Sequence, residues 1–268
     1  MPRWLLTLLR LTPIVASASA ASVIGLIAFR ACVSIEDLRE SSGDIGNYLQ
    51  TVGSIYAVLL AFVVFVVWGQ FNDARGYVER EATALVDLHR TASGLPITSR
   101  VAIQQGLHRY VEAVLRDEWR AMGKHDMATI ERCGHILDEV WLSIHKCQPG
   151  DACQHTIYSE VLTQFNQLTD LRTSRLISAE FRIPLGMKFL LYIGALIVTG
   201  SMYLIAIPQF WLHAITTAAL SGAIAHILYL IRDLDDAFSG DWRVDQRAFE
   251  RARKSFERTT HLIDTDCA

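Results

Sequence analysis

The apolar residues of this chain are concentrated in long stretches, and most charged residues lie between and after them. Three runs contain no charged residue at all: Leu11–Phe29, Ile45–Phe71 and Phe189–Ile231. The hydrocarbon core of a membrane offers no water to backbone N–H and C=O groups, so uncharged runs of about 18 residues or more predict transmembrane helices. The third run is too long for one span, and Pro208 divides it. The pattern therefore predicts four spans, at about 11–29, 45–70, 185–207 and 210–231.

The segment 72–184 shows the three- and four-residue spacing of apolar positions that is typical of amphipathic helices. Its first helix is expected to continue directly from the second span, because no proline occurs before Pro96. We expect one helix from about Ile45 to Ser93, three more helices in the segment, and a further helix over 244–262. The apolar face of the first one is formed by Val78, Ala82, Leu85 and Leu88.

These elements predict an all-α integral membrane protein with a helical soluble domain between spans 2 and 3. The expected parts are a first hairpin (1–71), the soluble domain (72–184), a second hairpin (185–231) and a tail (232–268). Lys and Arg are retained mainly on the cytoplasmic side of a membrane. They are frequent in the soluble domain and the tail and absent from the turn at Pro208. Both termini and the soluble domain are therefore predicted to be cytoplasmic.

The N-terminus has a second interpretation. Residues Met1–Ser22 could form a cleaved signal peptide, since Arg3 precedes an apolar stretch that ends in small residues at 16–20. Against this, Arg10 interrupts the stretch and Val23–Phe29 continues it past any cleavage site. A retained span is the prediction.

Composition limits the function classes. The net charge is -3 and the pI is about 6.3, whereas a nucleic-acid-binding protein would have a basic excess. The five cysteines have no regular spacing, which argues against a disulfide framework. No phosphate-binding glycine loop, nucleophile elbow or dinucleotide fingerprint is present. We predict a protein that is not an enzyme and has no cofactor.

Three groups of polar residues are candidate sites. The turn with His145, Cys147, Cys153 and His155 offers zinc ligands or a reversible disulfide, although incidental cysteines at a helix–helix turn explain it as well. His226 lies inside the fourth span, where ionisable residues are often functional, and is a candidate for gating or permeation; His213, near the start of that span, is less central. The alternative is a neutral histidine that hydrogen-bonds across the bundle.

The third group is acidic. Asp233, Asp235 and Asp236 follow the fourth span, with Asp241 shortly after, and carboxylates on a short loop are the ligands that calcium requires. A solvated helix end beside Arg232 and Arg243 is the alternative.

Two blocks of sequence point to a family. Residues 56–62 read Tyr-Ala-Val-Leu-Leu-Ala-Phe, and residues 238–242 read Phe-Ser-Gly-Asp-Trp. Together with Trp68, the Asn72–Arg75 segment and the acidic residues at 235–236, they resemble the bestrophin-like bacterial membrane proteins. The resemblance extends from about Ile45 to Ser255.

The resemblance implies a role for the second span. Bestrophins are homopentameric anion channels with four spans per subunit, a helical cytosolic part and a hydrophobic neck formed by span 2. By this resemblance, an apolar stripe on one face of span 2 would line the pore, in a bacterial inner membrane. The stripe consists of Ile55, Leu59, Phe62 and Val66.

The acidic segment also has a counterpart in the family. In animal members it clasps calcium, which would correspond to Asp233, Asp235, Asp236 and Asp241. Here the acidic run is shorter and is interrupted by residues 237–240, and bacterial members tend to lack the clasp. The expected partners are the lipid bilayer, further copies of the chain and permeant anions. The alternative function is a non-conducting membrane scaffold or sensor whose soluble helices bind a partner.

Overall fold

The computed structural model describes residues 3–39, 42–124 and 126–266, and within these ranges it contains helices and no strand. Met1, at the start of the candidate signal peptide, lies outside the described residues. The chain forms two compact units. The membrane unit comprises the chain up to Gly69 and Arg182–Asp235, and the soluble-type unit comprises Gln70–Phe181 and the chain from Asp236 onward. The prediction of an all-α protein is confirmed.

Four helices of the described chain are long and apolar enough to cross a membrane, which confirms the four predicted spans. They are α1 (Arg3–Cys32), α3 (Ser42–Thr91), α8 (Leu185–Tyr203) and α9 (Phe210–Leu234). The short α2 (Ile35–Arg39) lies between the first two. As expected, α3 continues without a break beyond the span, so its first part belongs to the membrane unit and the rest to the other unit.

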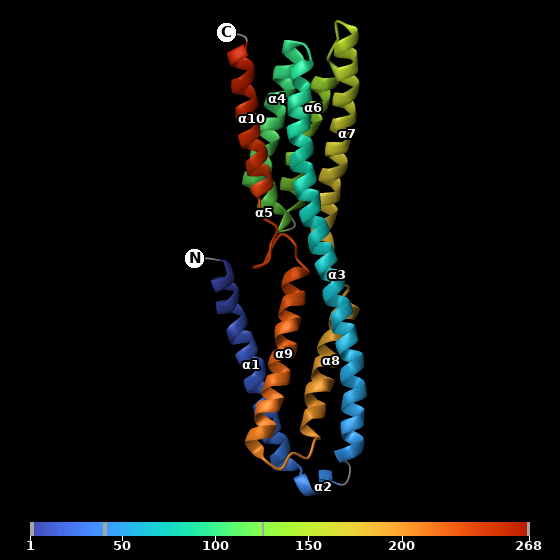
Figure 1. Cartoon of the computed structure of the whole chain (residues 1–268), viewed down its shortest axis with the longest axis vertical. Coiled ribbons are helices and arrows are strands. Elements are labelled where there is room, and N and C mark those ends of the chain that lie inside the picture. Colours follow the sequence, from blue (N-terminus) through green and yellow to red (C-terminus); the bar gives the residue numbers. More distant parts are fainter. Residues whose placement is uncertain (1–2, 40–41, 125, 267–268) are drawn as a thin grey trace. The chain divides into compact units, whose positions relative to one another are not determined.

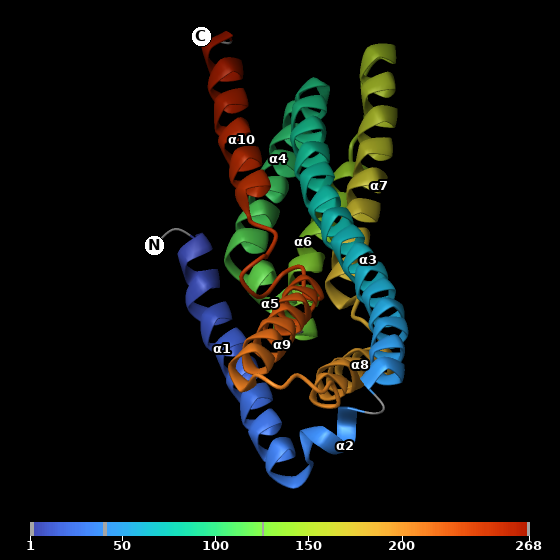
Figure 2. The ribbon, with the colours of Figure 1, turned by 60° about the horizontal axis from the view of Figure 1, so that its bottom comes forward.

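Small residues allow α1 and α9 to pack closely, and both ribbon views show the two helices side by side (Figure 1, Figure 2). The hydroxyl oxygens of Ser22 and Ser221 lie 2.7 Å apart, and Ser19 Oγ donates to the Ala218 carbonyl. A Cβ atom on Gly222 would lie 2.8 Å from Ser19 Oγ. Membrane helices associate through such close backbone contacts, because lipid provides no hydrophobic driving force between them.

One aromatic residue joins α3 to α8 within the membrane unit. Tyr56 Oη donates to the Leu191 carbonyl at 2.8 Å, and a Cβ atom on Gly194 would lie 2.5 Å from the Tyr56 ring. The buried face of this part of α3 continues from Tyr56 at intervals of three and four residues. It consists of Tyr56, Leu60, Val63 and Val67.

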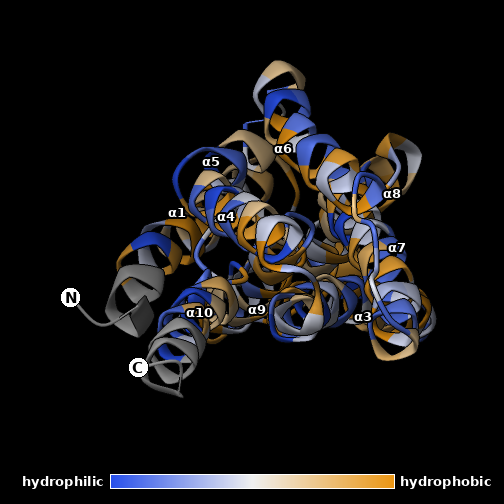
Figure 3. Cartoon of the chain, turned by 90° about the horizontal axis from the view of Figure 1, so that it is seen from above, coloured by the Kyte–Doolittle hydropathy of each residue, from blue (hydrophilic) through white to orange (hydrophobic). Residues whose placement is uncertain are grey.

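The soluble-type unit is a helical bundle around an apolar core. Besides the end of α3, its elements are η1 (Ala92–Gly94), α4 (Ile97–Ala113), η2 (Val114–Glu118), α5 (Trp119–Met122), α6 (Met127–His145), α7 (Ala152–Glu180) and α10 (Arg247–Asp266). Both polar and apolar sides are visible on α4 and α6 (Figure 3). The helix predicted after Pro96 contains an unexpected π-helical turn, η2, and buried Glu118 lies at its end.

Candidate functional site

The predicted pore stripe lies on the face of α3 that does not pack against the membrane unit. Ile55 is 67% exposed and Phe62 58% exposed, while Leu59 and Val66 are partly exposed. The adjacent face of the helix, formed by Tyr56, Leu60, Val63 and Val67, is buried. The four side chains are therefore free to face lipid, another subunit or a pore, and their role as pore lining remains a prediction.

The exposed apolar surface of α3 is wider than the predicted stripe. Val58 and Phe65 are 70% and 75% exposed, and Trp68 is also exposed. All three lie on the same span as the stripe. Exposure in one chain therefore does not separate a pore-facing position from a lipid-facing one, since both are apolar in a membrane protein.

His226 is exposed on α9 and makes no hydrogen bond to another residue in the part of the chain that the structure describes. Its predicted role in gating or permeation remains a prediction. The buried histidine of this helix is instead His213, which is 1% exposed.

His213 belongs to a polar cluster with Arg30. The Arg30 guanidinium donates to His213 Nδ1 at 2.9 Å and to the Ile207 carbonyl, and it lies 5.6 Å from the Phe210 ring centroid. His213 Nε2 lies 2.8 Å from the Met202 carbonyl oxygen. Since arginine only donates and a carbonyl only accepts, the ring must be neutral with its proton on Nε2. The cluster ties the end of α1 to the α8–α9 turn.

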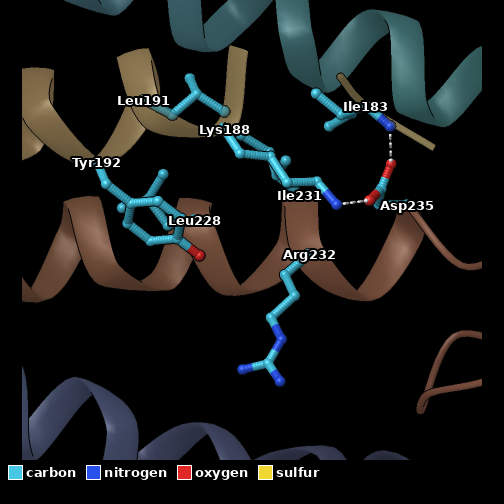
Figure 4. A pocket seen from close by; sticks show the side chains of 8 residues that line it. All are labelled: Ile183, Lys188, Leu191, Tyr192, Leu228, Ile231, Arg232 and Asp235. Carbon is cyan, nitrogen blue, oxygen red and sulfur yellow. Dashed lines mark hydrogen bonds and ion pairs between the residues drawn. The ribbon is translucent and has the colours of Figure 1, made fainter. Parts of the chain in front are cut away.

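Asp235, at the other end of α9, is an anchor for the start of α8 (Figure 4). Its Oδ1 accepts the backbone N–H of Ile183 at 2.6 Å, and its Oδ2 lies 2.7 Å from Lys188 Nζ. These groups border a small cavity of about 140 Å³ whose other walls include Leu191, Tyr192 and Leu228. Asp235 is buried, so its carboxylate needs both partners.

The predicted calcium ligands do not converge. Asp235 is engaged with Lys188, while Asp236 Oδ1 accepts the backbone N–H groups of Phe238 and Ser239 in a tight turn. The turn leads to Gly240, which has a φ of 79°. No group of three or more His, Cys, Asp or Glu side chains is placed to share a metal ion within the described ranges. The calcium site, like the roles of Asp233 and Asp241 in it, stays a prediction that this geometry does not support.

The cysteine–histidine turn gives no metal or disulfide geometry either. Cys147 is buried and Cys153 is exposed, and both are free thiols. The turn is ordered by helix capping, because the Asp151 carboxylate accepts the backbone N–H of Gln154 at 2.7 Å.

A buried ionic cluster in the soluble-type unit was not predicted from the sequence. Arg175 on α7 donates through Nε to Glu81 Oε2 at 2.6 Å and also binds Glu118. Tyr110 Oη donates to Glu81 Oε1 at 2.6 Å, and Arg172 donates to Glu118 at 2.7 Å. The cluster links α3, α4, η2 and α7.

Opposite charges favour the ionised forms of Arg175 and Glu118. Burial alone would lower the pKa of Arg175, but the carboxylates of Glu81 and Glu118 raise it well above its ordinary value. Burial alone would raise the pKa of Glu118, but Arg175 and Arg172 lower it. A sequence signal for the cluster exists. Glu81 and Glu118 occupy apolar positions of their helical repeats, three residues after Val78 and four after Val114.

Solved structures of a bacterial bestrophin homologue have a similar fold. A bacterial bestrophin homologue from Klebsiella pneumoniae has a TM-score of 0.67 and 13% identity, covering 95% of this chain and 98% of that one. A singly substituted form of this homologue has a TM-score of 0.71 and 13% identity, with 92% and 98% coverage. At this identity the likeness shows the shared fold. Among curated protein sequences, none matches this chain.

The sequence pattern of a known family covers most of the chain. The bestrophin-like domain matches residues 16–249, which include all of α3, α8 and α9 and the loop after Asp235. Both blocks of sequence on which the resemblance rested fall within this range. The chain is therefore a membrane protein of the bestrophin-like family.

Proposed function

We propose that the protein is one subunit of a homo-oligomeric, anion-permeable channel whose pore is lined by α3. The observation that carries the proposal is the apolar stripe of Ile55, Leu59, Phe62 and Val66, which is exposed at Ile55 and Phe62 and partly exposed at the other two positions, on a chain of the bestrophin-like family. Bestrophins are homopentamers with a hydrophobic neck formed by span 2, so a pentamer is the proposed assembly.

The proposed gate is a hydrophobic constriction. Narrow apolar pores lose their water, and an ion cannot cross a dry segment without losing its hydration. A ring of Phe62 side chains, with rings of Ile55, Leu59 and Val66 on either side along α3, would form such a segment. The gate then opens when the rings move apart enough for water to enter.

The proposed location is the inner membrane of a bacterial cell, with both termini and the soluble-type unit in the cytoplasm. The support is the concentration of Lys and Arg in 72–184 and in the tail, compared with their absence from the turn at Pro208. A tag placed near Gln154 should therefore react with a membrane-impermeant reagent only after the cells are opened. Labelling in intact cells would contradict this orientation.

Two measurements test the channel proposal. Purified protein in chloride-loaded liposomes should release chloride faster than empty liposomes do, and native mass spectrometry in detergent should show a pentamer. A monomer or compact dimer without chloride release would overturn the proposal. Such a result would favour the alternative of a non-conducting scaffold.

A further inference from the structure

The soluble-type unit contains a polar cleft that belongs to none of the sites above. Its volume is about 300 Å³, at the lower end of the range for ligand pockets. It lies between the second part of α3 and the segment that leads into α10. Phe71, Val78 and Val244, which are all buried, form its floor. We call it the arginine cleft after the residues at its rim: Arg75, Arg243, Arg247 and Arg251.

The charges at the rim do not balance. Two carboxylates also line the cleft, and each is paired with an arginine: Glu79 with Arg251, and Asp245 with Arg247 at 3.2 Å. Arg75 and Arg243 make no ion pair or hydrogen bond to another residue in the described part of the chain. Four arginines facing two carboxylates leave a net charge of +2 around one cavity. Two guanidinium groups are thus available to an anion.

The position of the cleft along α3 is also informative. Phe71 is the last apolar residue of the uncharged run that begins at Ile45, and Arg75 follows four residues later. Four residues correspond to roughly 6 Å along the helix axis. The cleft therefore begins where the apolar span ends, at the depth where lipid phosphates meet water.

We propose that the arginine cleft binds a phosphate group. Guanidinium groups donate two parallel hydrogen bonds to phosphate oxygens, and a phosphate group offers several oxygens that two unpaired arginines can bind together, which chloride does not. The phosphate has two sources that fit this chemistry: a soluble phosphate compound, or the head group of an anionic phospholipid whose apolar part lies towards Phe71. The proposal does not depend on ion conduction.

The test measures binding to the full-length protein in detergent, with two probes. Inorganic phosphate is titrated by calorimetry at low ionic strength, and phosphatidylglycerol is compared with zwitterionic phosphatidylcholine by native mass spectrometry. The cleft variant is Arg75→Gln/Arg243→Gln. The control variant is Arg109→Gln/Arg132→Gln, which removes the same charge from exposed positions on α4 and α6.

We expect the cleft variant to bind at least about tenfold more weakly, because each arginine contributes charged hydrogen bonds. The control variant should bind as the unmodified protein does. Binding of inorganic phosphate that the cleft variant loses identifies a soluble ligand. If the unmodified protein binds phosphatidylglycerol but neither phosphatidylcholine nor inorganic phosphate, and the cleft variant loses this binding, the ligand is a lipid head group. Binding of neither probe, or an equal loss in both variants, overturns the proposal.

Discussion

The helices inside the membrane unit and those inside the soluble-type unit are packed by different kinds of contact. In the membrane unit, small residues and hydroxyl groups form the helix contacts, as at Gly222 and Ser22, and large apolar side chains such as Phe65 are exposed. The soluble-type unit has a buried core of large apolar residues, and the ionic cluster around Arg175 is buried with it. Burial therefore has a different meaning in each unit, because one unit is solvated by lipid and the other by water.

The largest expected effect comes from breaking the ionic cluster. Arg175→Met should lower the free energy of unfolding of the soluble-type unit by about 3–5 kcal/mol, because it leaves Glu81 and Glu118 buried without their main partner. Thermal unfolding followed by circular dichroism would measure the change. The control is Arg109→Met, which removes an exposed ion pair with Glu139 and should cost no more than about 1 kcal/mol.

Replacing the three fully buried charges together tests whether the loss of stability in the Arg175→Met variant comes from unpaired carboxylates. A Glu81→Met/Glu118→Met/Arg175→Met variant removes the three fully buried charges and leaves only the partly exposed Arg172 without its carboxylate partner, so it should be more stable than the Arg175→Met protein. If the triple variant is the less stable of the two, the cost lies in lost packing and not in uncompensated charge.

The contact between α1 and α9 should be sensitive to a single methyl group. Gly222→Ala places a Cβ atom against Ser19 Oγ and Val15, and should destabilise the membrane unit by about 1–3 kcal/mol. The matched control is Gly200→Ala on α8, where a Cβ atom would meet no atom within 4 Å. Unfolding of both variants by a denaturing detergent would measure the difference. Equal stability of the two would show that close packing at Gly222 is not required.

The smallest expected effect is a pH dependence at α10. Phe256 stacks on His89 at 4.3 Å and meets His108 edge-on at 4.9 Å between ring centroids. Burial lowers the pKa of His108, although Glu257 and Glu112 act in the opposite direction. The unfolded chain therefore takes up the proton more readily, and stability should fall as the pH drops through the ordinary histidine value of about 6.5.

Replacing His108 with phenylalanine tests this pH dependence of stability. His108→Phe keeps an aromatic ring beside Phe256 but cannot be protonated, so its melting temperature should change less between pH 7.5 and pH 5.5 than that of the unmodified protein. The same decrease in both proteins would place the pH dependence elsewhere.

The fold could be predicted from the sequence to a large extent, because long uncharged runs are compatible with few environments. The four spans, the turn at Pro208 and the unbroken helix through Phe71 follow from charge and proline positions alone. The sites were harder to predict. His226 was selected because it lies deep within the predicted span. The buried histidine is instead His213, and its partner Arg30 lies 183 positions away in the sequence, so no local pattern could indicate the pair.

The ionic cluster shows the same limit. Glu81 and Arg175 are 94 positions apart, so no local pattern connects them. The one local signal, the placement of Glu81 and Glu118 at apolar positions of their helical repeats, was not used in the sequence interpretation. The pore stripe raises the reverse difficulty, since a lipid-facing and a pore-facing residue can have the same chemistry and the same exposure.

A pair of phenylalanine substitutions tests the central claim most directly. Phe62 and Phe65 lie on the same span, are both exposed and have the same side chain, but only Phe62 belongs to the proposed pore stripe. In reconstituted liposomes, Phe62→Ala should raise chloride conductance, as Ile55→Ala should, because a wider and less apolar constriction stays hydrated. Phe65→Ala should leave conductance unchanged. Equal conductance in the two phenylalanine variants, or no conductance in either, would contradict the assignment of this face of α3 to a pore.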